Sequence, residues 1–180
     1  REILTWVSKS CIVPMDRISV VEEIRAENVN VRGDPTQIYE AFLNLCMNAR
    51  EAMEGGGKIQ IEVDNVYLDY GSSLLGPEMR EGEYVRVKLK DAGAGMKPEI
   101  LRKAPDPFFT TKRRYGRRGL GLPVSIGIIE NHGGKLLIKS KPGEGTEVVV
   151  LLPVTYSEVP KGSTVERSGE VDKLRVLVVD

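Results

Sequence analysis

The chain has 180 residues, of which 41% are hydrophobic and 29% are charged, the ordinary mixture of a soluble globular protein. Its 26 basic and 26 acidic side chains balance, so the net charge gives no indication of binding to nucleic acid or to a membrane surface. No stretch approaches the roughly 20 apolar residues of a membrane span, and no signal peptide opens the chain, so we expect a cytoplasmic domain.

The chain begins at Arg1 without a methionine, so we expect a fragment of a longer protein. Any membrane anchor of that protein is then expected in regions outside this chain. There are two cysteines, Cys11 and Cys46. Because Cys46 falls within a helical pattern, a small buried hydrophobe is favoured there over a disulfide.

The first third of the chain predicts a linker or helix end, two strands and one strong helix. The strands are expected over residues 18–24 and 29–31, where apolar runs occur. The helix is predicted over residues 34–53, because Asp34 is a good N-cap and Pro35 suits the first helical position. Apolar residues at three- and four-residue spacing form its buried stripe: Ile38, Ala41, Phe42, Leu45, Ala49 and Ala52.

A second, polar stripe runs beside the apolar one and contains Gln37, Glu40, Asn44, Asn48 and Glu51. Because Asn44 and Asn48 are four residues apart, their amides lie on one helix face, one turn apart. An amide oxygen can ligate Mg²⁺ directly or through water. The stripe therefore favours a nucleotide–metal site, and the alternative is a solvated helix face.

The middle of the chain predicts two strands of alternating polarity, over residues 58–63 and 84–90, joined by a long connection. A short helix is expected over residues 98–104. Residues 105–121 are rich in glycine, proline and basic side chains and predict a loop of unusual length. A loop this long inside a compact domain is usually functional or mobile. A helix over residues 122–132 follows it.

The end of the chain predicts two strands, a linker and a third strand. The first two strands are expected over residues 136–140 and 146–152, around a Pro-Gly turn. Residues 155–172 have the Ser-, Gly- and charge-rich composition of a linker. The β-branched run over residues 174–179, which leads into Asp180, is typical of a buried parallel strand.

Two glycine-rich segments carry further chemistry. In DAGAGM, residues 91–96, Gly93 and Gly95 allow a tight turn and close approach of backbone to a ligand. The Asp91 carboxylate, at a strand end, can accept a hydrogen bond from the exocyclic amine of adenine. The alternative is an ordinary turn.

The second segment, GRRGLGL at residues 116–122, opens a helix, where backbone N–H groups bind phosphate. Five basic side chains crowd this loop: Lys112, Arg113, Arg114, Arg117 and Arg118. They are consistent with a triphosphate ligand, and the alternatives are a solvated basic loop or a contact to an acidic partner. The P-loop pattern GxxxxGK[ST] does not occur in the chain.

In this order and spacing, the segments resemble the ATP-binding catalytic domain of bacterial sensor histidine kinases. NLCMNAREAM is similar to the family's N box, DAGAGM to its first G box, PDPFFTTK to its F box and RRGLGL to its second G box. The resemblance implies an α/β fold of the GHKL (Bergerat) type. This is an α+β two-layer sandwich in which a mixed β-sheet packs on helices, with ATP under a long mobile lid at residues 97–118.

The resemblance also implies roles for particular residues. Asn48 would ligate Mg²⁺ with Asn44 in support, and these two and Lys112 would be the catalytic residues. Asp91 would receive the adenine amine, Gly93 and Gly95 would let adenine approach, and backbone at residues 119–121 would meet the phosphates. The implied ATP-binding set is Asn44, Asn48, Glu51, Asp91, Gly93, Gly95, Met96, Phe108, Thr111, Lys112, Arg118, Gly119, Leu120, Gly121, Leu122 and Thr146.

Three departures from the family pattern bear on activity. Arg117-Arg118 replaces the usual Gly-Thr, Ala92 stands where Thr or Asn is common, and Glu51 stands where many relatives have Lys. Arg117-Arg118 and Ala92 support one alternative, a pseudokinase that senses nucleotide or acts as a scaffold. A second alternative is a GHKL ATPase, but those enzymes carry a Glu general base at the position of Asn44, and a neutral amide cannot accept the proton.

The resemblance further implies the domain organisation and the partners. Residues 1–14 would link to an upstream dimerisation domain that carries the phosphoacceptor histidine. Residues 15–154 would form the catalytic domain, 155–172 a linker and 173–180 the first strand of a receiver domain. The single histidine, His132, ends a helix and is not a plausible phosphoacceptor. We therefore expect a hybrid kinase, homodimeric at full length, that passes the ATP γ-phosphate to an external histidine and then to a receiver Asp, with ATP and Mg²⁺ as cofactors.

Overall fold

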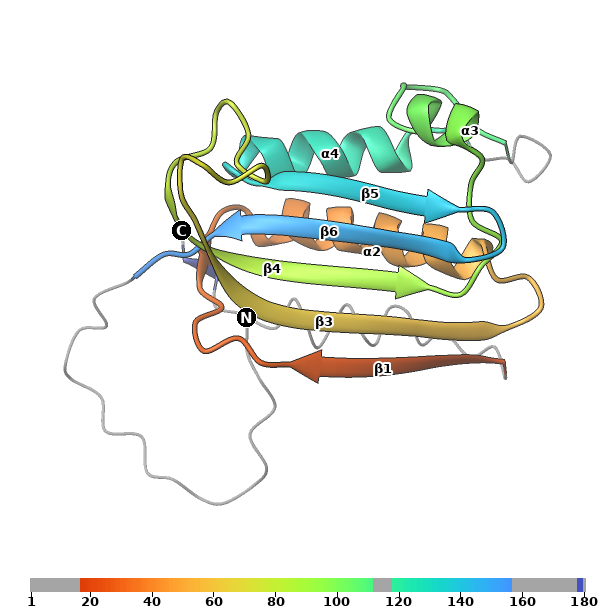
Figure 1. Cartoon of the computed structure of the whole chain (residues 1–180), viewed down its shortest axis with the longest axis horizontal. Coiled ribbons are helices and arrows are strands. Elements are labelled where there is room, and N and C mark those ends of the chain that lie inside the picture. Colours follow the sequence, from red (N-terminus) through yellow and green to blue (C-terminus); the bar gives the residue numbers. More distant parts are fainter. Residues whose placement is uncertain (1–16, 112–117, 157–177, 180) are drawn as a thin grey trace, which may run out of the picture.

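The computed structural model describes residues 17–111 and 118–156, together with the backbone of 178–179. Figure 1 shows a mixed sheet with its longer helices behind it. The elements are β1 (Ile18–Ile24), β2 (Val31–Arg32), α2 (Pro35–Glu51), β3 (Gly57–Leu68), β4 (Gly82–Asp91), α3 (Pro98–Lys103), α4 (Gly121–Asn131), β5 (Lys135–Lys141), β6 (Gly145–Pro153) and β7 (Val178–Val179). Within the described ranges, no helix combines the length and the apolar character needed to cross a membrane.

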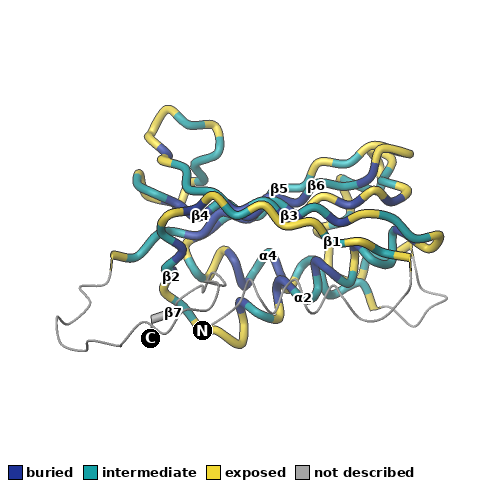
Figure 2. The backbone as a smooth tube through the Cα atoms, turned by 90° about the horizontal axis from the view of Figure 1, so that it is seen from below, coloured by how far each residue is buried: buried dark blue, intermediate teal, exposed yellow. Residues whose placement is uncertain are grey.

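The main sheet has five strands in the order β1-β3-β4-β6-β5. β1 runs parallel to β3, and the other neighbours are antiparallel, so the sheet is mixed as predicted. Helices α2 and α4 cover one face of this sheet (Figure 2). The predicted two-layer α/β sandwich is therefore confirmed.

Helix α2 forms where its capping and periodicity predict it. The Asp34 carboxylate accepts hydrogen bonds from the N–H groups of Thr36, at 2.8 Å, and Gln37, at 3.2 Å. The buried face of the helix consists of Ile38, Ala41, Phe42, Leu45, Cys46 and Ala49. Burying each of the large apolar side chains contributes roughly 1.5–3 kcal/mol, so this stripe anchors the helix to the sheet.

Cys46 is 1% exposed, as the helical pattern predicts. It is, however, disulfide-bonded, so the preference for a simple buried hydrophobe is wrong. A helical pattern reports burial of a side chain and carries no information on the partner of its sulfur. Cys11 lies outside the described residues.

Strand β3 is longer than its alternating pattern predicts, because the apolar residues change sides of the sheet. Ile59, Ile61 and Val63 join the core under the helices. Val66 and Leu68 instead join a second apolar cluster with Met79, Tyr84, Val149 and Leu151. The expected long connection consequently begins after Leu68.

The second predicted strand is displaced, and the last is described only at its end. β2 comprises Val31–Arg32, whereas Val29 is buried outside a strand. Residues 178–179 pair in parallel with β2. The remainder of the predicted strand over 174–179, and the linker over 157–172, lie outside the described residues.

The face of the sheet opposite the helices carries paired charges across neighbouring strands. The Arg86 guanidinium contacts the Asp64 carboxylate twice, at 2.8 and 2.5 Å, and Lys88 reaches Glu62 at 3.0 Å. The hydrogen bond from Arg86 lowers the pKa of Asp64 below its usual value near 3.8. Folding therefore favours the ionised carboxylate, and the bridge stabilises the fold wherever Asp64 is charged.

Replacing Asp64 with Asn should lower the free energy of unfolding by about 1 kcal/mol at neutral pH, as expected for a half-buried bidentate pair. Because the pKa of Asp64 is depressed in the fold, this contribution is complete above the unfolded pKa and is lost as pH falls through the folded pKa. The difference between parent and variant in denaturant unfolding should therefore shrink below about pH 4. A difference that is constant from pH 7 to pH 3 would contradict this account.

Candidate nucleotide-binding site

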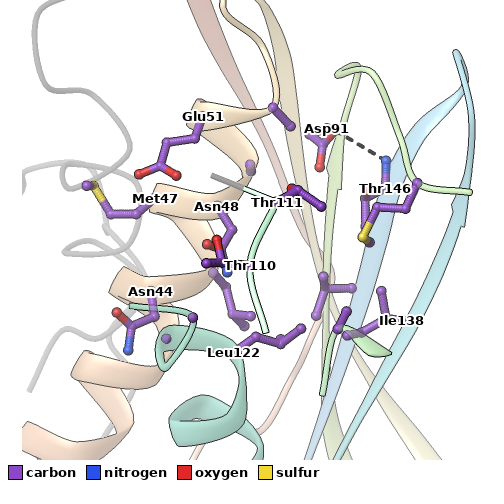
Figure 3. Close-up of a pocket in the computed structure, with 18 of the residues that line it drawn as sticks. Asn44, Met47, Asn48, Glu51, Asp91, Thr110, Thr111, Leu122, Ile138 and Thr146 are labelled. Carbon is purple, nitrogen blue, oxygen red and sulfur yellow. Dashed lines mark hydrogen bonds between the residues drawn. The ribbon is translucent and has the colours of Figure 1, made fainter. Parts of the chain in front are cut away.

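A pocket of about 790 Å³ lies between the two helices and the sheet. Figure 3 shows Asn44, Asn48 and Glu51 at successive positions along α2, and Asp91 and Thr146 on the sheet at the other side of the view. Further lining residues come from α2 and the strands β4, β5 and β6, from the glycine-rich turn after β4, from α3, from the two ends of the following loop, and from the start of α4. A volume of this size accommodates a nucleotide.

The helix wall of the pocket is fixed by antiparallel packing of α2 against α4. The Ser125 hydroxyl on α4 is fully buried and lies 3.1 Å from the Ala41 carbonyl of α2 and 2.9 Å from the Gly121 carbonyl. Gly121 itself abuts Asn44, whose side-chain oxygen lies 3.5 Å from the position that a Cβ on Gly121 would take. The Asn44 amide and the turn that is predicted to bind phosphate, at Gly121, are thus neighbours.

The start of α4 lines the pocket with residues 119–122. Its N-cap residue, Leu120, makes no capping side-chain hydrogen bond, unlike Asp34 on α2. Gly119 has φ +69°, and a Cβ there would lie 2.4 Å from the Phe109 carbonyl oxygen, so the turn requires glycine. Backbone donors at a helix N-terminus, with the helix dipole behind them, suit a phosphate group.

The opposite wall holds Asp91 in one orientation. It is 4% exposed at the end of β4, and its Oδ1 accepts hydrogen bonds from the N–H groups of Gly93, at 2.8 Å, and Thr146, at 3.2 Å. Two backbone donors fix the plane of the carboxylate. A buried carboxylate of fixed orientation is suited to recognising a donor on a planar base.

The structure brings most of the predicted binding residues to this pocket. Those that line it are Asn44, Asn48, Glu51, Asp91, Gly95, Met96, Thr111, Arg118, Gly119, Leu120, Gly121, Leu122 and Thr146. Gly93 is absent from the lining: a Cβ there would lie 2.6 Å from Ala52 on α2, so this glycine permits the turn to pack on the helix. Lys112, Arg113, Arg114 and Arg117 lie outside the described residues.

The first phenylalanine of the F box does not line the pocket either. Phe108 is 65% exposed with φ +65°, and its neighbour Phe109 occupies the lining instead. The Phe108 N–H donates to the Gly119 carbonyl at 3.0 Å and joins the two ends of the loop. Adjacent identical residues give no sequence signal for which of them faces inward.

Several apolar residues complete the pocket and were missed by motif reasoning: Leu45, Leu89, Ile100, Phe109, Ile138 and Val148. In sequence they read as ordinary core positions, because a side chain that borders a cavity has the same periodicity as one that packs fully. Met47 and Thr110 also line the pocket. The apolar side chain of Met47 suits the flat face of a base, and the hydroxyl of Thr110 suits the polar edge of a sugar.

The oxygen donors of the pocket could bind Mg²⁺ only if a bound nucleotide supplied further oxygens. Asn48 is exposed at the pocket wall, and Glu51 lies in the same lining. In the described ranges, no cluster of three or more His, Cys, Asp or Glu side chains could hold a metal alone. Mg²⁺ bound through phosphates and water needs only one or two protein oxygens, which the Asn48 amide and the Glu51 carboxylate could supply.

Comparison with known proteins agrees with this geometry. Residues 33–156 match the family described as histidine kinase-, DNA gyrase B- and HSP90-like ATPase. The chain is 36% identical over 128 residues to the sensor kinase CckA of Brucella abortus, covering 71% of this chain and 14% of CckA. It is also 36% identical over 121 residues to sporulation kinase E of Bacillus subtilis, covering 67% of this chain and 14% of the relative. The chain therefore spans about one seventh of these relatives.

Solved structures show the same fold. The nucleotide-free catalytic domain of the histidine kinase ThkA superposes with a TM-score of 0.59 at 30% identity, covering 83% of each chain. A mycobacterial sensor histidine kinase, MprB, gives a TM-score of 0.64 at 19% identity over 84% of this chain and 93% of that one. With its fold, its pocket and its match over residues 33–156, the chain belongs to the histidine kinase-, DNA gyrase B- and HSP90-like ATPase family.

Proposed function

We propose that this chain is the ATP- and Mg²⁺-binding catalytic domain of a sensor histidine kinase. The observation that carries the proposal is the pocket in which an uncapped helix start, a fixed buried carboxylate and a row of amide side chains converge. Asp91 selects adenine, the N–H groups at the start of α4 hold the phosphates, and Asn48 binds Mg²⁺. The similarity to sensor and sporulation kinases supports the same activity.

Transfer to an external nucleophile suits this pocket better than hydrolysis does. The side chain of Asn44, which lies against Gly121, is a neutral amide and cannot take a proton from water. The site therefore acts mainly by orienting ATP and neutralising its charge. The expected nucleophile is a histidine on a separate upstream domain, with a receiver aspartate as the next acceptor and a homodimer as the working form.

Two other functions remain as alternatives. Glu51 is a carboxylate in the pocket lining, and this favours the ATPase alternative if it activates water. Arg118 in the lining and the departure at Ala92 are the basis of the pseudokinase alternative. Ala92, however, is exposed and absent from the lining, so this substitution removes no pocket contact.

A transfer assay separates the three functions. The chain is incubated with γ-labelled ATP and Mg²⁺, with and without a separately purified phosphoacceptor domain from a sensor kinase. We expect labelled histidine only when the acceptor is present, and little phosphate release without it. Rapid phosphate release by the chain alone, abolished by Glu51→Gln, would identify an ATPase, and ATP binding without any labelled acceptor would identify a pseudokinase.

Asn48→Ala should abolish the part of ATP affinity that depends on Mg²⁺, because it removes the amide oxygen proposed as the ligand. Calorimetry with ATP in the presence of Mg²⁺ and then of a chelator measures this part directly. Asn131→Ala, the same substitution at the exposed end of α4, is the matched control and should bind as the parent does. If Asn48→Ala keeps the full Mg²⁺ dependence, the ligand assignment is wrong.

Asp91→Asn should weaken ATP binding by about ten- to a hundredfold and reduce the preference for ATP over GTP, because an amide offers a donor where the adenine amine needs an acceptor. Competition binding with both nucleotides gives this ratio. Asp64→Asn, on the opposite face of the sheet, is the matched control. An unchanged ATP-to-GTP ratio in Asp91→Asn would exclude the adenine contact.

A further inference from the structure

Besides the hydrogen bond between Ser125 and Ala41, a second hydrogen bond joins α2 and α4. It lies at the ends of the two helices that are remote from the phosphate turn. His132 is the C-cap residue of α4 and the single histidine of the chain. Its ring Nε2 lies 3.0 Å from the backbone N of Asp34, the N-cap residue of α2. Its ring Nδ1 lies 2.7 Å from the carbonyl oxygen of Ile128, within α4.

These two contacts specify one chemical form of the ring. A backbone N–H is only a donor, so Nε2 must carry a lone pair to accept from Asp34, and a carbonyl is only an acceptor, so Nδ1 must carry the proton. The imidazole is therefore neutral, with hydrogen on Nδ1. A doubly protonated ring would place two donors against each other at Asp34 and lose this hydrogen bond.

Close packing against Gly33 also holds the imidazole ring of His132 in place. A Cβ on Gly33 would lie 2.0 Å from Cδ2 and 2.6 Å from Nε2 of His132, so any side chain at position 33 displaces the ring. The backbone conformation of Gly33 is not left-handed, which means that the imidazole, rather than the turn, requires glycine there. Gly33 and His132 thus form one contact.

The position of this contact connects it to the nucleotide pocket. Ala41, which is hydrogen-bonded to Ser125, lies seven residues after Asp34 and seven before Asn48. At 1.5 Å per residue, each arm of the helix is about 10 Å long. The hydrogen bond at Ala41 and the one at Asp34 join α2 to α4 at two separate points, so loss of the contact at His132 changes how the two helices pack along the length that leads to Asn48.

We propose that His132 is a positioning residue, which in its neutral form fixes the angle between α2 and α4 and so the distance from Asn48 to the phosphate turn. The proposal rests on the proposed nucleotide function of the pocket. The charged residues nearest to the contact along the chain are Arg32 at the end of β2, Asp34 before α2, and Glu130 on α4. The Asp34 carboxylate is engaged by the N–H groups of residues 36 and 37, so the ring contact uses only the backbone of Asp34.

The first test needs no nucleotide. Because there is one histidine, a long-range ¹⁵N–¹H spectrum of the labelled chain contains a single imidazole, and its nitrogen shifts report the tautomer. We expect hydrogen on Nδ1, and a shift of the Asp34 amide resonance when His132 is replaced with Ala. Hydrogen on Nε2, or an Asp34 amide that is unaffected by His132→Ala, would overturn the contact.

The second test measures Mg²⁺–ATP affinity by calorimetry for the parent, His132→Ala, His132→Gln and Gly33→Ala. Loss of one hydrogen bond should weaken binding about three- to tenfold in His132→Ala at pH 8, and Gly33→Ala should do the same by displacing the ring. The glutamine oxygen can accept from Asp34 in place of Nε2 and does not titrate. His132→Gln should therefore bind within about twofold of the parent at pH 8.

Rescue by glutamine separates positioning from general stability. His132→Gln should keep the parental affinity while His132→Ala loses it, and denaturant unfolding of the same proteins shows whether a loss reflects stability alone. Equal losses in His132→Ala and His132→Gln, or unchanged affinity in both His132→Ala and Gly33→Ala, would overturn the proposal. If the parent binds no ATP while the spectrum shows the Nδ1 tautomer, the proposed function fails and the contact stands.

Discussion

The structure depends on the burial of one face of α2 between the sheet and α4. Ala41 and Ile38 are at most 1% exposed, and this face cannot rotate without bringing polar side chains into the core. Because a helix is rigid over its length, fixing its apolar face also fixes the direction of its polar stripe. The amides of Asn44 and Asn48 therefore take their place at the pocket wall from the packing of the whole buried face, including Ile38 and Ala41, which do not line the pocket.

The remaining walls are tied to this helix by backbone contacts. The carbonyl of Ala52, at the end of α2, accepts a hydrogen bond from the Ala94 N–H at 3.1 Å, which holds the turn after β4 against the helix. Gly121 meets Asn44 on the other side. The turn proposed to hold adenine and the turn proposed to hold the phosphates are thus placed relative to one helix, which explains how segments more than 25 residues apart form a single site.

Much of this arrangement could be predicted from the sequence, because its signals are local. The cap at Asp34, the apolar stripe and the glycine-rich turns each follow from nearby residues. The exceptions are features decided by distant partners. Val66 and Leu68 extend β3 because a second cluster covers the other face of the sheet, and the choice of Phe109 over Phe108 for the pocket depends on how the loop returns to Gly119.

The disulfide at Cys46 and the ring contact of His132 were invisible in the sequence for the same reason. Each depends on the partner of a side chain, and periodicity records only whether a side chain is buried. The sequence placed His132 at the end of a helix, but it did not indicate that the ring contacts the start of another helix 98 residues earlier in the chain. Residues that border a cavity are likewise indistinguishable in sequence from residues of a closed core.

The central claim is that α2 and α4 together form one wall of an ATP site. The other wall is the sheet where β4 ends, at Asp91. Titration of the isotope-labelled chain with Mg²⁺ and a non-hydrolysable ATP analogue, followed residue by residue by NMR, tests it most directly. The account predicts saturable shifts of the Asn48, Gly121 and Asp91 amides with one common affinity, and little change at Arg86 on the opposite face. Shifts confined to one wall, different affinities for the two walls, or no saturable shifts would contradict it.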